Sequence, residues 1–172
     1  MDYQEIVKFH GHECPGLAMG YRMAQAGMQR LNALRSEDEE IVAIVENNAC
    51  GVDALQCVTG CTFGKGNLIF KDYGKHVYTL YSRVSGKGVR ILFHGKRMPS
   101  TISDDRQALA QFILKAPAED ILSYTEVDID EPLPARIHKS VTCDICGEKV
   151  METRLIDLEG KRVCIPCAGK KR

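Results

Sequence analysis

The chain of 172 residues has no apolar run that approaches the roughly 18 residues of a membrane span. Its first residues, MDYQEIVKFHG, have neither the basic stretch nor the apolar stretch of a secretory signal peptide. Apolar residues make up 44% of the chain and charged residues 27%, a balance that excludes a disordered or fibrous protein. We therefore expect a globular, cytoplasmic protein that makes no use of a membrane.

The chain also has no net charge, with 23 Lys and Arg against 23 Asp and Glu. Residues 139–172 carry eight basic and five acidic side chains, a balance of +3, and the remainder carries fifteen and eighteen, a balance of −3. A protein that binds nucleic acid presents a concentrated basic face to the phosphates. The C-terminal excess is too small for such a face, so nucleic acid is not an expected partner.

Cysteine, in contrast, is abundant. Disulfides are disfavoured in a reducing cytoplasm, so metal ligation or redox chemistry is the first explanation for eight cysteines. They fall into two groups of four. One group lies in the first third of the chain (Cys14, Cys50, Cys57 and Cys61), and the other lies at the C-terminus (Cys143, Cys146, Cys164 and Cys167).

Apolar periodicity predicts an α+β protein, in which a mixed helix and antiparallel-sheet core precedes a small zinc finger. Helices are expected over residues 2–9, 16–34, 49–61 and 104–115, the last of them capped by Ser103 or Asp104. Strands are expected over residues 41–46, 67–71, 76–84, 88–94 and 121–129. We divide the chain into a core domain over residues 1–129, a linker over 130–140 and a finger over 141–172.

The C-terminal cysteines form two C-x2-C pairs, Cys143 with Cys146 and Cys164 with Cys167, which are separated by seventeen residues. Each pair presents two sulfurs from a tight turn, and two such turns close a tetrahedral site with no open position. Gly147 follows the first pair, where such a turn often needs a positive φ. The spacing predicts a structural zinc ion, whose binding supplies the folding energy of a unit with little core of its own.

The segment HGHECPG concentrates three candidate ligands in five residues: His10, His12 and Cys14. If the segment is extended, all three project to one side, because the strand period is two. Pro15 suits the first position of a helix, which puts Cys14 at the helix N-terminus. There the helix dipole stabilises a thiolate, as a metal ligand or as a reactive nucleophile.

The other cysteines of the first group, Cys50, Cys57 and Cys61, lie on one stripe of the helix expected over residues 49–61. Cys57 and Cys61 are one turn apart and have the spacing to share a metal. The same stripe is equally well explained by core packing, because cysteine behaves as a small hydrophobic residue. Asp53 lies off this stripe, where it faces a ligand or solvent.

The loop GCTFGKGN lacks the spacing and the Ser/Thr of a phosphate-binding loop, and it precedes a strand rather than a helix. Nucleotide binding by that route is excluded. Lys65 in this loop remains a candidate for binding an anionic cofactor.

Three segments of the chain together resemble a known family. FHGHECPGLAMGYRMA, NNACGVDALQCVTGCTFGKGNL and the terminal C4 finger are similar to the FmdE family, which is named for a subunit of formylmethanofuran dehydrogenase. The finger itself, CDICGEKV…RL…CIPC, resembles the DksA/TraR type, which often serves protein contacts.

This resemblance implies an α+β core that carries a metal or redox site, with His10, His12, Cys14, Cys57 and Cys61 as its candidate residues. It also implies a homodimer, in which the fingers are exchanged in some members, and the other subunits of a dehydrogenase complex as partners. Methanogenic members are associated with a molybdenum- or tungsten-dependent formylmethanofuran dehydrogenase, an oxidoreductase.

Three functional hypotheses follow. The first is a metal-binding accessory or redox protein that has a core His/Cys site, holding a second metal ion, and a structural zinc finger. The second is a separate enzyme that uses Cys14 as nucleophile and His10 or His12 as base. The third is an interaction or regulatory protein that acts through its finger.

Overall fold

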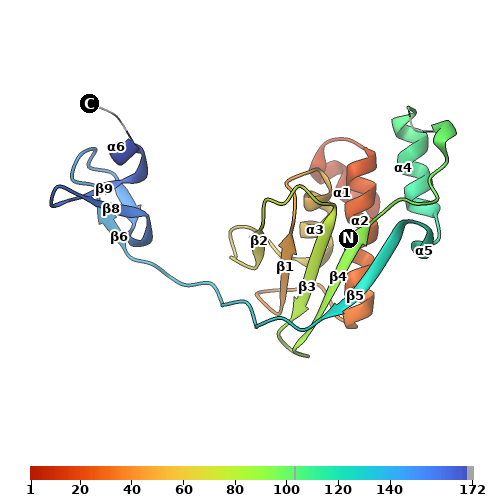
Figure 1. Cartoon of the computed structure of the whole chain (residues 1–172), viewed down its shortest axis with the longest axis horizontal. Coiled ribbons are helices and arrows are strands. Elements are labelled where there is room, and N and C mark those ends of the chain that lie inside the picture. The colour runs from red at the N-terminus through yellow and green to blue at the C-terminus, as the bar shows by residue number, and fades with distance from the viewer. Residues whose placement is uncertain (103, 170–172) are drawn as a thin grey trace. The chain divides into compact units, whose positions relative to one another are not determined.

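A computed structural model describes residues 1–102 and 104–169 of the chain. The chain divides into two compact units, Met1–Ala135 and Arg136–Arg172 (Figure 1). In the described part of the chain, no helix has the length and apolar character that a membrane crossing requires.

A five-stranded sheet in the order β2-β1-β3-β4-β5 forms the framework of the first unit. Its strands are β1 (Ile41–Val45), β2 (Leu68–Phe70), β3 (Val77–Ser82), β4 (Lys87–Phe93) and β5 (Leu122–Val127). Strands β1 and β2 pair in parallel, and all other pairs are antiparallel. The predicted α+β class is confirmed, although the sheet is mixed because a helical crossover joins β1 to β2.

The helices of this unit are α1 (Tyr3–His10), α2 (Pro15–Leu31), α3 (Gly51–Thr59), α4 (Arg106–Lys115) and α5 (Ala118–Ile121), with a 3-10 turn η1 (Ser100–Ile102). Four of the helices lie within two or three residues of the expected bounds, whereas the short helix α5 and the 3-10 turn η1 were not expected. The N-cap of helix α4 is Asp105 and not Asp104. The Asp105 carboxylate accepts hydrogen bonds from the amides of Gln107 and Ala108. Ser103, the other expected cap, lies outside the described residues.

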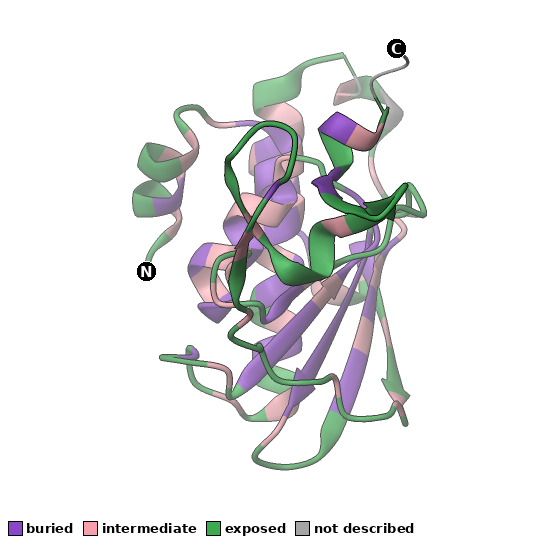
Figure 2. Ribbon diagram, turned by 90° about the vertical axis from the view of Figure 1, so that its left-hand side faces the viewer, coloured by how far each residue is buried: buried purple, intermediate pink, exposed green. Residues whose placement is uncertain are grey.

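Helix α2 is the central element against which the sheet and helix α3 pack, and its inner side is buried (Figure 2). Gly27 allows its close approach to the sheet, because a Cβ there would lie 2.7 Å from Leu80 and 2.9 Å from Ile91. Gly20 allows a closer approach still, since a Cβ there would overlap the backbone of Gly51 on helix α3. The two helix backbones are thus in direct contact, which fixes the ends of both helices relative to each other.

The segment after β5 is anchored to the core. Arg83 donates from Nη1 to the Glu131 carboxylate at 2.7 Å and to the Pro132 carbonyl at 2.6 Å. The Ala135 amide donates to the Glu39 carboxylate at 3.0 Å. The first half of the segment expected to be a linker, 130–140, is therefore held against the first unit.

The second unit contains two small antiparallel sheets. Its elements are β6 (Ser140–Thr142), β7 (Lys149–Met151), η2 (Glu152–Arg154), β8 (Leu155–Leu158), β9 (Lys161–Cys164) and α6 (Ile165–Gly169). Strands β8 and β9 are joined by Glu159 and Gly160, which both have a positive φ. Gly147 has the positive φ of 75° that the sequence predicted after the first cysteine pair.

Candidate metal centre

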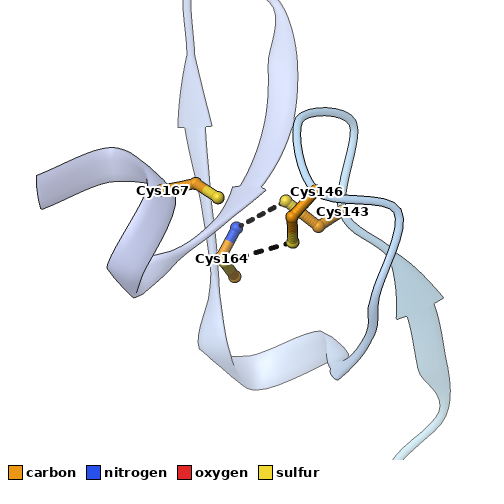
Figure 3. A group of neighbouring side chains, drawn as sticks. All are labelled: Cys143, Cys146, Cys164 and Cys167. Atoms are coloured by element: carbon orange, nitrogen blue, oxygen red, sulfur yellow. Dashed lines mark hydrogen bonds between the residues drawn. The ribbon is translucent and has the colours of Figure 1, made fainter. Parts of the chain in front are cut away.

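The four C-terminal cysteines converge at one point of the second unit (Figure 3). Their sulfur atoms all lie within 4.8 Å of one another, and the sulfurs of Cys146 and Cys164 are 3.9 Å apart. Tetrahedral zinc with bonds of about 2.3 Å needs sulfurs roughly 3.8 Å apart, which this arrangement nearly supplies. The quartet is a structural zinc site, as the sequence predicted.

Electrostatics at this quartet favour a bound cation. Hydrogen bonds from the backbone amides of Cys146, Cys164 and Ile145 lower the pKa of the Cys143 thiol to about 6. A hydrogen bond with the neighbouring Cys164 thiol, followed by burial, raises the pKa of Cys167 to about 12. A divalent cation between the sulfurs stabilises their thiolate forms and allows all four to ionise.

A second group of metal-ligating atoms lies in the core domain, where three helix ends meet. His10 is the last residue of α1, Cys14 is the N-cap of α2, and Cys50 is the N-cap of α3. One nitrogen of His10 and the sulfurs of Cys14 and Cys50 all lie within 4.8 Å of one another. His10 Nε2 is 4.0 Å from Cys14 Sγ, close to the ligand separation of a tetrahedral site.

Hydrogen bonds hold two of these side chains, Cys14 and His10, in place. Cys14 is 2% exposed, and its sulfur accepts a hydrogen bond from the Leu17 amide at 3.4 Å, as expected of an N-cap residue. Cys50 is half-buried, and burial followed by its contact with Cys14 raises the pKa of its thiol. His10 Nδ1 donates to Asp53 Oδ2 at 2.7 Å, so the imidazole is fixed from the side opposite Cys14.

Glycines make this convergence possible. A Cβ at Gly16 would lie 3.3 Å from the Cys50 Cβ and 4.0 Å from the Cys14 sulfur. A Cβ at Gly51 would meet the Tyr78 hydroxyl, at 2.6 Å, and the Gly16 carbonyl oxygen, at 2.8 Å. Larger side chains at these two residues would push α2 and α3 apart and separate their cysteines.

The structure separates His12 from the other candidates of its segment. The expected extended conformation does not form, because α1 continues through His10 and Gly11 ends it with a left-handed φ of 95°. His12 is exposed and lies outside the three-ligand group, but its ring stacks against His10 with centroids 4.6 Å apart. His12 therefore lies at the edge of the site, beside the His10 ring.

The remaining cysteines of the expected stripe also differ in their surroundings. Cys57 is buried in a small apolar cluster that includes Cys14, and its sulfur is not part of the ligand group. Cys61 follows the end of α3, because Gly60 caps that helix with a positive φ of 77°. It is fully buried in the main core, its thiol donates to the Ile41 carbonyl at 3.2 Å, and burial raises its pKa to about 11.

Lys65 makes its contacts away from this group. Its ammonium group donates to the Glu37 carbonyl at 3.1 Å, which ties the loop after α3 to the segment before β1. Its expected role in anion binding stays a prediction.

The sequence gives only weak evidence for Cys50, a member of the core group, and for Asp53, which contacts His10. Cys50 is one member of a stripe that core packing explains equally well, and Asp53 lies off that stripe. Cys50 and Asp53 are three residues apart in the sequence. If the start of the helix had been known, this spacing would have placed both at its first turn. The sequence also did not predict that the Tyr3 hydroxyl is buried and has no hydrogen-bond partner among the described residues.

Comparisons with known proteins agree with this architecture. The family model described as "FmdE, Molybdenum formylmethanofuran dehydrogenase operon" matches residues 9–123, more than half of the chain. The chain belongs to the FmdE family. The finger of this FmdE-family chain matches the prokaryotic dksA/traR C4-type zinc finger over residues 138–172.

Two relatives of this FmdE-family chain span most of its length. A curated protein of Archaeoglobus fulgidus, named "Probable S-adenosyl-L-methionine-binding protein", is 33% identical over 192 aligned residues, which cover 94% of this chain and 51% of that protein. The chain thus spans about half the length of that relative. The crystal structure of a tungsten formylmethanofuran dehydrogenase FmdE-like protein from Syntrophus aciditrophicus is 27% identical, with a TM-score of 0.72 over 98% of this chain and 93% of that chain.

Proposed function

We propose that this chain is a metal-binding accessory or redox protein, related to the FmdE proteins of formylmethanofuran dehydrogenase, whose functional centre is the core group of His10, Cys14 and Cys50. The zinc finger would be a scaffold rather than the reactive site. The convergence of one imidazole nitrogen and two cysteine sulfurs within 4.8 Å, at the ends of three helices, is the observation that carries the proposal.

The donor set fits a transition metal. One imidazole and two thiolates suit Zn²⁺, and by ligand softness they also suit iron or copper. Three protein ligands leave a fourth coordination position, which in zinc proteins distinguishes a catalytic site from a structural one. A metal bound here would supply Lewis acidity or, if it is iron or copper, one-electron redox chemistry.

Metal counting tests the proposal directly. The full chain, purified without added metal and then loaded and desalted, should contain two metal ions by elemental analysis. Cys143→Ser should remove the finger zinc and leave the core ion, and Cys14→Ser or Cys50→Ser should do the reverse. Cys61→Ala is the matched control. The buried Cys61 thiol donates a hydrogen bond to the Ile41 carbonyl and does not belong to the core group.

One outcome would disprove metal binding at the core group. If the wild type holds a single zinc ion that is lost entirely in Cys143→Ser, the core group binds no metal. An X-ray anomalous map at the metal edge would then show density only among the four finger cysteines.

A second candidate, a thiol-dependent enzyme, is favoured by one specific observation. Cys14, His10 and Asp53 are arranged in series, with 4.0 Å from the thiol to Nε2 and 2.7 Å from Nδ1 to the carboxylate. A nucleophile, a base and a group that orients the base have this order in thiol enzymes. Rapid alkylation of Cys14 in the metal-loaded chain, with Cys57 unmodified, would favour the enzyme over the metal centre.

We further propose that the chain is a homodimer and that dehydrogenase-complex subunits are its partners. Ile156 and Leu158, on the same side of β8 in the finger unit, are each 42% exposed, and such apolar surface on a small unit suits a protein contact. Sedimentation equilibrium should give twice the chain mass, and replacing both residues by Asp should shift it toward the monomer. Val84→Asp, at an exposed apolar residue of the first unit, is the control. A monomeric wild type would contradict the dimer.

A further inference from the structure

The hydrogen bond between His10 and Asp53 points to a role for a residue that the ligand set does not include. We infer that Asp53 is a positioning residue, which holds the proton of His10 on Nδ1 and so aims the Nε2 lone pair at the core group. The inference rests on the proposed function for its consequence, metal binding, but the contact itself is independent of any metal.

Asp53 lies in the first turn of α3, but it is not part of a capping box. An acidic residue in the first turn of a helix commonly interacts with the helix dipole or completes a capping box. The N-cap of α3 is Cys50, and its side chain makes no capping hydrogen bond, so no capping box forms around Asp53. Its carboxylate instead reaches a residue forty-three positions earlier in the chain, on a different helix.

The chemistry of the contact fixes the tautomer. An ionised carboxylate can only accept hydrogen bonds, so at 2.7 Å the His10 Nδ1 must carry the proton. In the neutral ring Nε2 is then unprotonated, and Nε2 is the atom that lies 4.0 Å from Cys14 Sγ. A ring free to rotate or to change tautomer would present an N–H to the metal for part of the time.

The surroundings of the pair are suited to this task. The His10 side chain is only 10% exposed, so little water competes for its ring nitrogens, whereas the Asp53 side chain is 40% exposed. The His12 ring, stacked at 4.6 Å, limits rotation of the imidazole from another side. Cys50 and Asp53 both belong to the N-terminal turn of α3, so one rigid element supplies a ligand and the residue that orients another ligand.

The test uses the full chain and three variants: Asp53→Asn, Asp53→Ala and, as matched control, Asp72→Asn, which changes an exposed aspartate in the loop before β3. Zinc affinity of the core site is measured by competition with a chromophoric chelator, with the finger already loaded. Loss of a carboxylate that orients a metal-bound histidine lowers affinity by about 10–100-fold. We expect that loss in both Asp53 variants, unchanged finger zinc, and wild-type affinity in Asp72→Asn.

A second measurement reports the tautomer itself. Long-range proton–nitrogen NMR correlations of ¹⁵N-histidine-labelled protein should show His10 with its proton on Nδ1 in the wild type and a mixture of tautomers in Asp53→Ala. A merely structural Asp53 would leave this pattern unchanged. Equal zinc affinity in wild type and both variants, or the same His10 tautomer in wild type and Asp53→Ala, would overturn the inference.

The two readouts also separate the inference from the proposed function. If the wild-type core binds no zinc but the His10 proton sits on Nδ1 and loses that preference in Asp53→Ala, the metal proposal fails and the positioning role stands. If the core binds zinc with equal strength in all variants, the metal proposal stands and the positioning role fails.

Discussion

The contact between Gly20 of α2 and Gly51 of α3 predicts that Gly20→Ala will damage both stability and the core site. A Cβ on Gly20 would lie 2.5 Å from the Gly51 carbonyl carbon and closer still to its oxygen and Cα. Carbon atoms prefer a separation of about 3.5 Å, so the two helices must move apart by roughly 1 Å. The obstacle is backbone, which has no rotamer to change.

Two effects of the substitution oppose each other. Alanine is favoured over glycine inside a helix by about 1 kcal/mol. Overpacking a filled interior costs about 1–3 kcal/mol, and the upper end applies where neither side can yield. We therefore expect a net loss of about 2 kcal/mol in the free energy of unfolding, which lowers Tm by about 4–8 °C in a chain of this size.

The substitution should also weaken the metal binding proposed for the core group, since Cys14 is the N-cap of α2 and Cys50 is the N-cap of α3. Urea unfolding followed by circular dichroism gives the stability, and elemental analysis gives the metal content. Gly64→Ala is the matched control, because a Cβ there would meet nothing within 4 Å. If Gly20→Ala is as stable as Gly64→Ala and keeps its core metal, the helices are not in the contact described and the reasoning is refuted.

Three further predictions concern other parts of the chain. Cys61→Ala should cost about 1–3 kcal/mol in urea unfolding, because a buried thiol bonded to the Ile41 carbonyl is lost, with no change in metal content; a lost core ion would contradict this. Glu40 has a pKa lowered from 4.5 to about 2, chiefly by the Ser36 hydroxyl, so its contribution to stability is complete above pH 4.5 and disappears as the pH falls toward 2. The stability difference between wild type and Glu40→Gln should shrink across that window, and a constant difference would be evidence against it. Chelator in excess should make residues 136–169 sensitive to protease while residues 1–135 resist, because the finger has too small a core to fold without zinc; mass spectrometry of the fragments would reveal equal digestion of both parts if this is wrong.

Much of the architecture was predictable because its signals are local. The strands around Tyr78 and Ile91 follow from runs rich in strand-forming residues, although β3 is buried at every residue and not on alternate ones. The two C-x2-C pairs needed only their spacing to predict a zinc site. Cys14 could be placed at a helix start because Pro15 follows it. Each of these conclusions depends on patterns within short segments of the chain.

The composition of the core site was less predictable, because it depends on where helices end and which ends meet. One left-handed glycine, Gly11, turns the chain after α1, and His12 lies beside the His10 ring but outside the ligand group. Another, Gly60, ends α3 before Cys61, which then enters the main core. Shifting a helix end by one or two residues changes which side chains share a face, and propensity does not fix ends that finely.

The sequence by itself determined the zinc finger, the α+β class and the family, since ligand spacing and apolar periodicity are properties of short segments. Only the tertiary structure decided that Cys50 rather than Cys57 or Cys61 joins His10 and Cys14, and that Asp53 holds His10. The physical reason is the direct contact of two helix backbones at Gly20 and Gly51. That contact brings together residues more than thirty positions apart, and no local pattern in the sequence encodes their distance.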